Sequence, residues 1–161
     1  MKIGIVGMGP AGLMAGSQLA KAGNEIHFFD HKKAAGRKFL VAGNGGFNLT
    51  HSEEVTSFIE KYDKALIQQA VKEFDNNDWI VFLEKEIKVP TFIGSSGKIF
   101  PEKGIKPITV LYNWLNYLIH YGATFHYEHS LLDFDSNSIT LKYKGETIKQ
   151  EFDYVIIALG G

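Results

Sequence analysis

The fold of this chain is decided by the stretch KIGIVGMGPAG at residues 2–12. The apolar run at residues 2–6 predicts a short buried strand. From Pro10 to Lys21 the apolar residues recur at helical spacing, and Gly23 stands in the position that favours the end of a helix. A strand, a glycine-rich turn and a helix therefore follow one another directly.

Gly7, Gly9 and Gly12 form the pattern G-x-G-x-x-G in this context. The first glycine permits a tight turn, the second lets a pyrophosphate approach the backbone, and the third allows close packing of helix on strand. Free N–H groups at the start of the helix would face the phosphates. Asp30, at the end of the next predicted strand (Glu25 to Asp30), is placed to bind a ribose hydroxyl, and its charge disfavours a 2′-phosphate. The pattern predicts a dinucleotide site and leaves NAD and FAD both open.

The composition is that of a single soluble domain with a small-molecule partner. The 161 residues carry a net charge of −1 and charges of both signs are interspersed, so neither nucleic acid nor a membrane is an expected partner. The chain has no cysteine, which excludes disulfides, thiolate metal sites and a redox-active cysteine pair. Electrons would therefore move on a bound cofactor, and no metal site is expected. Neither a signal peptide nor an apolar run of about 18 residues is found, so we expect a cytoplasmic protein.

The middle of the chain predicts a long loop followed by helices. Residues 36–50 hold several glycines and asparagines without periodicity, which indicates a specifically shaped loop. Thr50 and Glu53 have the spacing of a capping box, predicting a helix over residues 53–61. Asp63 would cap a second helix whose inner face is Leu66, Ile67, Ala70, Val71 and Phe74, and a further helical turn or two covers residues 79–83.

The second half of the chain predicts one more helix and several strands. Residues 90–101 suggest a hairpin or an irregular loop. A helix runs from Pro107 to about Tyr121 and is ended by Gly122. Strands follow at about residues 124–129, 138–143 and 147–152, with Lys144-Gly145 turning the last two. Residues 154–159 form a continuous apolar run, as a buried parallel strand would. The expected fold class is α/β: a Rossmann-like FAD/NAD(P)-binding fold with a central parallel sheet and a small antiparallel β-meander.

Four segments of the chain resemble the bacterial NAD(P)/FAD-dependent oxidoreductases of the aminoacetone-oxidase-like or BaiN-like type. These segments are GMGPAGLMA at residues 7–15, GRKFLVAGNGGFNLTH at 36–51, SSGKIFP at 95–101 and YVIIALGG at 154–161. The second segment is the most specific to these flavoproteins. Members of the family usually have Glu where this chain has Asp30, Ala-Thr-Gly-Gly where it has Leu159 in the last segment, and often Arg-Cys where it has Gly46-Phe47. The missing cysteine means that no thiol chemistry is carried over.

The resemblance implies that FAD is the cofactor and that the glycine-rich second segment lies along the flavin. It implies a single FAD-binding domain over residues 1–161 that forms the N-terminal part of a longer architecture, since the family continues into a substrate-covering insertion and further flavin contacts. The cofactor-binding residues expected from the spacing and the resemblance together are Gly7, Gly9, Pro10, Ala11, Gly12, Asp30, His31, Lys38, Gly43, Asn44, Gly45, Gly46, Asn48, Leu131, Ala158, Gly160 and Gly161. For Asn44 and Asn48, turn geometry alone remains the alternative.

The catalytic residues stay unknown at this level. The six histidines lack metal-type spacing, and structural roles are favoured for them; His51, after the glycine-rich segment, is the one to test for catalysis. Residues 95–101 either flank the active site or form only a hairpin. The expected function is hydride or electron transfer through FAD, with NAD(P)H or an amine-type substrate as the reaction partner. The alternatives are a module that binds FAD or ADP without turnover and a simple NAD-binding module. The substrate and the oligomeric state are not determined by the sequence.

Overall fold

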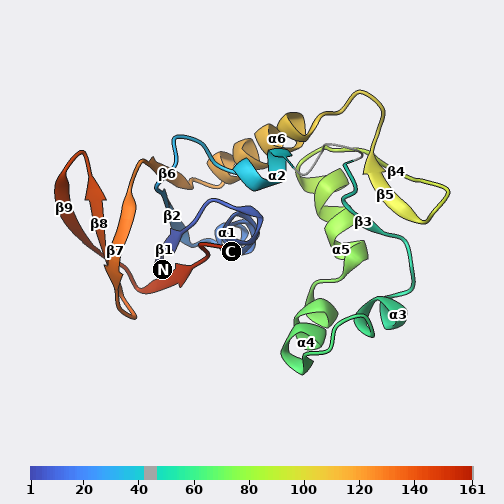
Figure 1. The fold of residues 1–161 in the computed structure, drawn as a ribbon, viewed down its shortest axis with the longest axis horizontal. Coiled ribbons are helices and arrows are strands. Elements are labelled where there is room, and N and C mark those ends of the chain that lie inside the picture. Colours follow the sequence, from blue (N-terminus) through green and yellow to red (C-terminus); the bar gives the residue numbers. More distant parts are fainter. Residues whose placement is uncertain (42–46, 161) are drawn as a thin grey trace. The chain divides into compact units, whose positions relative to one another are not determined.

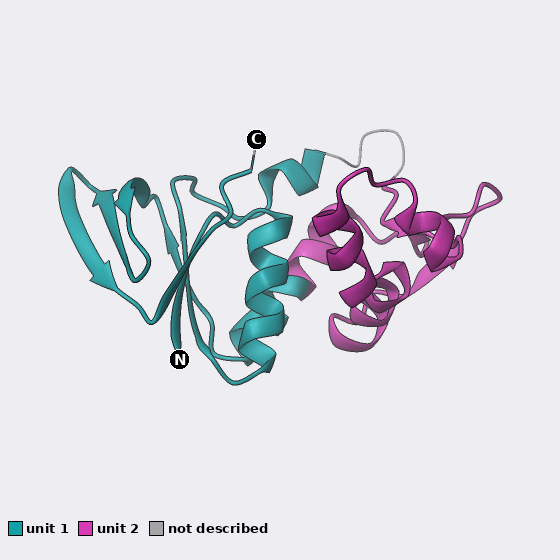
Figure 2. Cartoon of the chain, turned by 90° about the horizontal axis from the view of Figure 1, so that it is seen from below, with its two compact units in different colours: residues 1–41, 114–161 teal, residues 42–113 magenta. Residues whose placement is uncertain are grey.

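The computed structural model describes residues 1–41 and 47–160 and divides the chain into two compact units. Figure 2 shows the first unit, residues 1–41 and 114–161, and the second, residues 42–113. Within the described part of the chain, no helix combines the length and the apolar character needed to cross a membrane.

The first unit is built on a four-stranded parallel sheet. Its strands are β1 (Lys2–Val6), β2 (Glu25–Asp30), β6 (Thr124–Tyr127) and β10 (Tyr154–Ile157), in the order β10-β1-β2-β6. Helix α1 (Pro10–Lys21) connects β1 to β2, as the glycine pattern requires. The predicted strand, helix and second strand are confirmed, as is the α/β fold class with a central parallel sheet.

The predicted β-meander forms a separate antiparallel sheet. It consists of β7 (Ser130–Phe134), β8 (Ser138–Tyr143) and β9 (Glu146–Glu151), with Lys144 and Gly145 both at positive φ in the turn between β8 and β9. Strand β7 was not predicted from the sequence. Most of its side chains are exposed, so it lacks the alternation of apolar and polar residues that identifies a half-buried strand.

The parallel sheet lies between helices on one face and the meander on the other (Figures 1 and 2). Alternation along the strands produces this layering, because successive side chains point to opposite faces. Phe28 faces α1, where a side-chain carbon on Gly16 would lie 2.1 Å from its ring. Val6 and Phe29 instead belong to a buried cluster with residues of the meander and its return: Ile139, Leu141 and Phe152.

A buried hydrogen bond joins α1 to the end of α6 (Pro107–His120) within the first unit. The indole Nε1 of Trp114 donates to Ser17 Oγ at 2.8 Å, and that hydroxyl donates to the Leu13 carbonyl at 2.8 Å. Both side chains are almost completely buried, at 1% and 0% exposure. Because burial removes competing water, this bond stabilises the packing of the two helices.

We therefore expect Trp114→Phe to lower the free energy of unfolding by about 1–3 kcal/mol, through the lost bond and the cavity left by the smaller ring. Chemical denaturation followed by circular dichroism measures this loss. Trp79→Phe is the matched control, since Trp79 is only partly buried. An equal loss in both variants would contradict the assignment of the buried bond.

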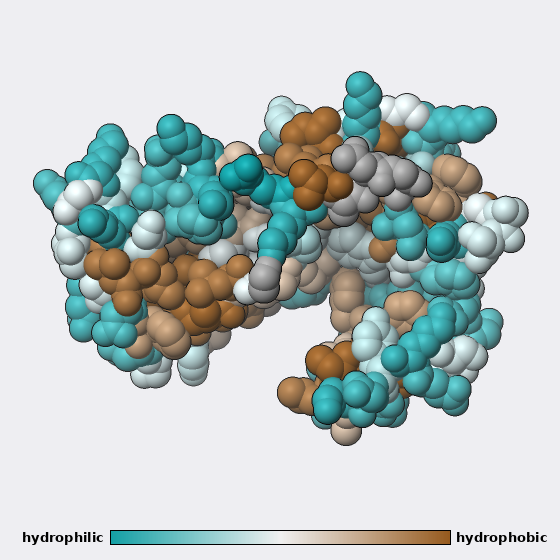
Figure 3. Space-filling view, in the orientation of Figure 1, coloured by the Kyte–Doolittle hydropathy of each residue, from teal (hydrophilic) through white to brown (hydrophobic). Residues whose placement is uncertain are grey.

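The expectation of a fully buried final strand is wrong. Strand β10 is an edge strand paired only with β1, so one side of its backbone lacks a neighbouring strand in the described chain. Figure 3 shows an apolar patch over β10 and β7. The exposed apolar side chains of this region are Leu132, Phe134, Ile157 and Leu159. An apolar run of this length is compatible with either environment, because periodicity alone does not distinguish them.

The second unit combines a small sheet with short helices. Its sheet has the order β3-β5-β4, formed by β3 (Thr50–His51), β5 (Lys98–Pro101) and β4 (Thr91–Ile93). Strands β4 and β5 pair antiparallel, which confirms the hairpin predicted over residues 90–101. The helices are α3 (Val55–Ile59), α4 (Ala65–Glu73), α5 (Asn76–Val81) and the π-helical turn η1 (Phe82–Glu86).

Several local predictions in this region are wrong. The expected loop over residues 36–50 begins with a helix, α2 (Arg37–Val41). Thr50 lies in β3 and does not cap a helix; the capping box is at Asp75, whose carboxylate accepts from the N–H groups of Asn77 and Asp78. Helix α4 starts after Lys64 without a side-chain cap, and its expected inner face is not buried, since Leu66 is 77% exposed. Two residues can have the spacing of a capping box by chance, and they have no capping role where no helix begins.

Candidate dinucleotide site

The glycine turn between β1 and α1 is packed so closely that side chains are excluded at two of its three positions. Gly7 has a φ of 110°, and a β-carbon built on it would lie 2.2 Å from the Ala158 carbonyl oxygen. A β-carbon on Gly12 would lie 2.0 Å from the Gly7 carbonyl oxygen. The tight turn and the close packing of helix on strand predicted for these positions are both confirmed.

Gly9 differs from the other two glycines because the space in front of it is open. A β-carbon built there meets no atom within 4 Å. Its backbone is extended, with a φ of −80°, so glycine is not required by the conformation of the protein itself. Neither the backbone nor the packing of the protein demands glycine here, and the open space would admit a group such as the pyrophosphate of dinucleotide-binding turns.

The start of α1 presents backbone N–H groups that have no acceptor within the helix. Gly9 is the N-cap and makes no side-chain capping bond, while Pro10 at the first helical position has no N–H. The N–H groups of Ala11 and Gly12 lie in the first turn, where a helix supplies no intrahelical acceptors. The positive end of the helix dipole adds to the attraction for an anion. This end of α1 is suited to a phosphate.

A hollow of about 190 Å³ lies in front of this turn within the first unit. Its walls bring together the glycine turn, the end of β2 and the segment after β10. Predicted site residues that line it are Gly7, Gly9, Pro10, Ala11, Asp30, His31, Lys38, Ala158 and Gly160. Lys38 reaches this wall from α2, since its Nζ lies 4.0 Å from a β-carbon built on Gly160. Residues from three distant parts of the sequence therefore meet at one end of the parallel sheet.

The carboxylate of Asp30 fastens the glycine turn to the end of β2. Its Oδ2 accepts from the Met8 N–H at 2.9 Å, and its Oδ1 accepts from the Lys32 N–H at 2.8 Å. His31 Nδ1 lies 3.4 Å from Oδ1. An ionised carboxylate has about four acceptor positions, so lone pairs remain for a ribose hydroxyl. Asp30 thus shapes the turn and still presents negative charge to the hollow.

We expect Asp30→Asn to weaken the binding of ADP about tenfold and to lower the free energy of unfolding by about 1–2 kcal/mol, because an amide nitrogen accepts no backbone N–H. Calorimetric titration with ADP and chemical denaturation measure the two effects. Asp133→Asn, at an exposed site on β7, is the matched control. Unchanged ADP affinity in Asp30→Asn would contradict a role for this carboxylate at the ligand.

A second, smaller hollow of about 50 Å³ shares Gly7, Asp30, His31 and Leu159 with the first. Leu131 of β7 lines it, which brings this predicted residue next to the end of β2 although the two are a hundred residues apart in sequence. His129 also lines it, and its ring stacks on Tyr143 with centroids 4.2 Å apart. Leu131 of the meander therefore forms part of a wall beside Asp30.

The remaining predicted residues are placed differently. Gly43, Asn44, Gly45, Gly46 and Gly161 lie outside the described residues. Asn48 is exposed and belongs to the second unit. These assignments stay predictions.

His51 makes structural contacts within the second unit through both ring nitrogens. Nε2 lies 3.0 Å from the Ser96 carbonyl oxygen, and Nδ1 lies 3.2 Å from the Glu53 N–H nitrogen. A neutral ring that donates from Nε2 and accepts at Nδ1 satisfies both contacts. The ring also packs against Gly97, where a β-carbon would lie 2.7 Å from it. These contacts give His51 a structural role, because they hold its ring against the turn between β4 and β5.

Sequence reasoning missed several residues of the larger hollow, notably Lys32, Arg37 and Leu159. Lys32 and Arg37 add two positive charges to the wall that holds Lys38. Basic residues directly after the acidic end of β2, and beside the Gly36 turn, are a signal that could have identified them. Leu159 was noted only as a departure from the family pattern, yet it lines both hollows.

A parallel sheet, an open glycine turn at a helix start and a carboxylate at the end of the second strand together define a dinucleotide-binding Rossmann domain. The chain belongs to the family of the HI0933-like protein Rossmann domain, whose model matches residues 1–161. This match confirms the resemblance to BaiN-like flavoproteins and supports FAD as the cofactor.

Comparisons with known proteins agree with this assignment. The chain is 30% identical over 104 residues to a ribosomal RNA dihydrouridine synthase of Haemophilus influenzae, a match covering 65% of this chain and 26% of that protein. It is similar in fold to a flavocytochrome c3 fumarate reductase, with a TM-score of 0.72, 18% identity and coverage of 99% of this chain and 33% of the other. A 3-ketosteroid-Δ4-(5α)-dehydrogenase of Rhodococcus jostii gives a TM-score of 0.67 at 12% identity, over 96% of this chain and 44% of the other. The chain thus spans less than half the length of each of these three proteins.

Proposed function

We propose that this chain binds FAD and forms the cofactor-binding part of a flavin-dependent oxidoreductase. The observation that carries the proposal is the open space at Gly9, in front of the N-terminal N–H groups of α1 and beside the Asp30 carboxylate. These features fit the ADP half of the cofactor: backbone N–H groups and Lys38 for the pyrophosphate, and Asp30 for the ribose.

The bound flavin supplies hydride and electron transfer, and the protein supplies binding and orientation. The described residues serve the binding of the cofactor. The positive charges of Lys32, Arg37 and Lys38 offset the pyrophosphate charge, while Asp30 disfavours a 2′-phosphate. The site therefore favours FAD over NADP as the resident nucleotide, and a nicotinamide nucleotide would act as a transient electron donor.

An anaerobic reduction assay tests the oxidoreductase part of the proposal. FAD-loaded protein is mixed with NADH or NADPH, and the flavin absorbance band is followed. Bleaching of the band supports electron transfer from a nicotinamide donor. A chain that binds FAD tightly but whose flavin is reduced by neither nucleotide would instead support the alternative of a binding module without turnover.

The similarity to a ribosomal RNA dihydrouridine synthase favours one substrate class over the small amine first considered. In this second candidate function, the whole protein delivers a hydride and a proton across the C5–C6 double bond of a uracil base in ribosomal RNA, with NAD(P)H as the source of the hydride. The overall charge of this chain does not attract RNA by itself, so the proposal places RNA contacts in other parts of the protein.

Mass spectrometry of ribosomal RNA tests this substrate assignment. RNA that lacks dihydrouridine is incubated with FAD-loaded protein and NADPH, digested, and searched for a uridine that has gained two hydrogen atoms. Such a nucleoside supports the assignment. Oxidation of an amine with no change in the RNA would favour the small-molecule substrate.

A further inference from the structure

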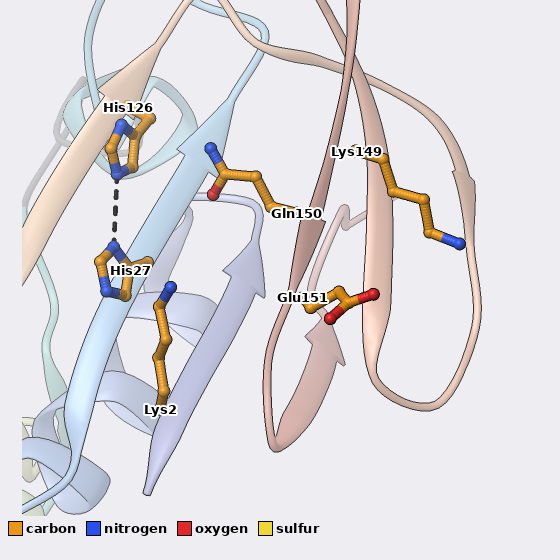
Figure 4. A pocket seen from close by; sticks show the side chains of 6 residues that line it. All are labelled: Lys2, His27, His126, Lys149, Gln150 and Glu151. Carbon is orange, nitrogen blue, oxygen red and sulfur yellow. Dashed lines mark hydrogen bonds between the residues drawn. The ribbon is translucent and has the colours of Figure 1, made fainter.

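A third hollow, lined by polar side chains, lies in the first unit away from the dinucleotide site. It is an open depression of about 700 Å³ that shares no lining residue with the two hollows described above. Its lining residues come from β1, β2, β6 and β9: Lys2, His27, His126, Lys149, Gln150 and Glu151. Figure 4 shows Lys2 and Gln150 pointing toward the two imidazoles, whereas Lys149 and Glu151 point to the other side of β9.

The two imidazoles belong to a chain of polar contacts that begins at the Glu25 carboxylate. Glu25 Oε1 lies 2.7 Å from His27 Nε2, and a carboxylate accepts only, so Nε2 carries a proton. Nδ1 of a neutral His27 is then an acceptor, and it lies 2.8 Å from the Thr124 hydroxyl and 3.5 Å from His126 Nε2. The rings are stacked, with centroids 5.8 Å apart. The chain of contacts thus runs from the Glu25 carboxylate through His27 to His126.

The charges around the pair make the hollow increasingly positive as the pH falls. Burial lowers the pKa of His126, and the positive charges of His27, His129 and Lys2 lower it further. Glu25, whose pKa is lowered mainly by its bond to His27, is engaged at the outer nitrogen of that ring, with the Met1 ammonium also near it. Among the lining residues Glu151 is acidic, and Lys2 and Lys149 are basic. A group whose folded pKa is depressed resists protonation until the pH falls below its ordinary value, so His126 gains its charge only in acid.

We propose that this hollow binds a small oxyanion, a carboxylate or a phosphate group, between the Lys2 ammonium and the imidazoles of His27 and His126, and that binding is coupled to proton uptake by His126. An anion placed there compensates the charges that otherwise keep His126 neutral. Linkage makes the effect reciprocal: the anion promotes protonation, and a lower pH tightens anion binding. The inference is independent of the proposed flavin chemistry, since no residue is shared.

Nuclear magnetic resonance of the histidine side chains tests the proposal with sulfate as the probe, because its charge is constant over the range in which histidine titrates. Sulfate is expected to raise the pKa of His126 above its value in sodium chloride of equal ionic strength. The dissociation constant for sulfate is expected to be about tenfold lower near pH ~5.5 than near pH ~7.5. A second arm replaces sulfate with acetate: a response to sulfate assigns a phosphate-type anion, and a response to acetate alone assigns a carboxylate.

Two variants and one control make the test specific. Lys2→Met should abolish the effect of sulfate on His126, and His126→Gln should abolish the pH dependence of sulfate binding, followed there on the resonances of His27. Lys144→Met should leave the response to sulfate unchanged. Lys2 and Lys144 each hold their Nζ 5.1 Å from an aromatic ring centroid, those of Phe152 and Tyr143, but Lys144 does not line the hollow. If His126→Gln does not fold, Lys2→Met decides alone. Equal effects of chloride and sulfate, no effect of either anion, or an undiminished response in Lys2→Met would overturn the proposal.

Discussion

Replacing Gly9 with alanine is expected to weaken FAD binding about a hundredfold, which corresponds to about 3 kcal/mol, while leaving the fold intact. The added β-carbon meets no protein atom within 4 Å, and a φ of −80° suits alanine. The methyl group would instead occupy the space where the pyrophosphate approaches the backbone. Fluorescence titration of the purified variant with FAD measures the affinity.

The melting temperature of the same variant is the internal control. A variant that melts as the parent chain does, and binds FAD weakly, assigns the effect to the ligand. Parent-like FAD affinity in Gly9→Ala would show that the open space in front of Gly9 is not where the cofactor binds.

Gly12→Ala is expected to have the opposite signature, destabilising the first unit by at least about 3 kcal/mol whether or not a ligand is present. Its β-carbon would lie 2.0 Å from the Gly7 carbonyl oxygen, and neither backbone can move without separating α1 from β1. Differential scanning calorimetry without added nucleotide measures the loss.

Gly9→Ala serves as the matched control for this second variant, because it adds the same methyl group three residues earlier in the same turn. A large difference in melting temperature between the two variants supports the packing argument. Two variants of equal stability would mean that the contact between α1 and the turn relaxes without cost.

The parts of the first unit that could be predicted are those where a local sequence pattern agrees with the packing that the whole fold requires. The fold of residues 2–30 can be predicted from local sequence, since the glycine turn, the amphipathic helix and the two flanking strands each have a distinct pattern. The placement of Asp30 beside the glycine turn also followed from its spacing. The bonds from its carboxylate to the Met8 and Lys32 N–H groups did not, because they depend on how the turn and the strand end meet in space.

Prediction failed for elements in which the pattern of apolar and polar side chains does not match their burial in the structure. Strand β7 is largely exposed, and α4 carries an apolar face that is not buried, so burial-based reasoning missed the first and misjudged the second. The false capping box at Thr50 shows the limit of short motifs, because Asp75 performs that role 25 residues later. The participation of Arg37 in the hollow depended on α2, a single helical turn with no sequence periodicity to reveal it.

An absorbance spectrum of the purified chain, from about 300 to 550 nm, tests the central claim most directly, with FAD identified by release and chromatography. The account predicts a flavin band that persists through gel filtration, or that appears on reconstitution with FAD and is displaced by excess ADP. A colourless protein that takes up no flavin after reconstitution, or that binds NADH in preference to FAD, would contradict it.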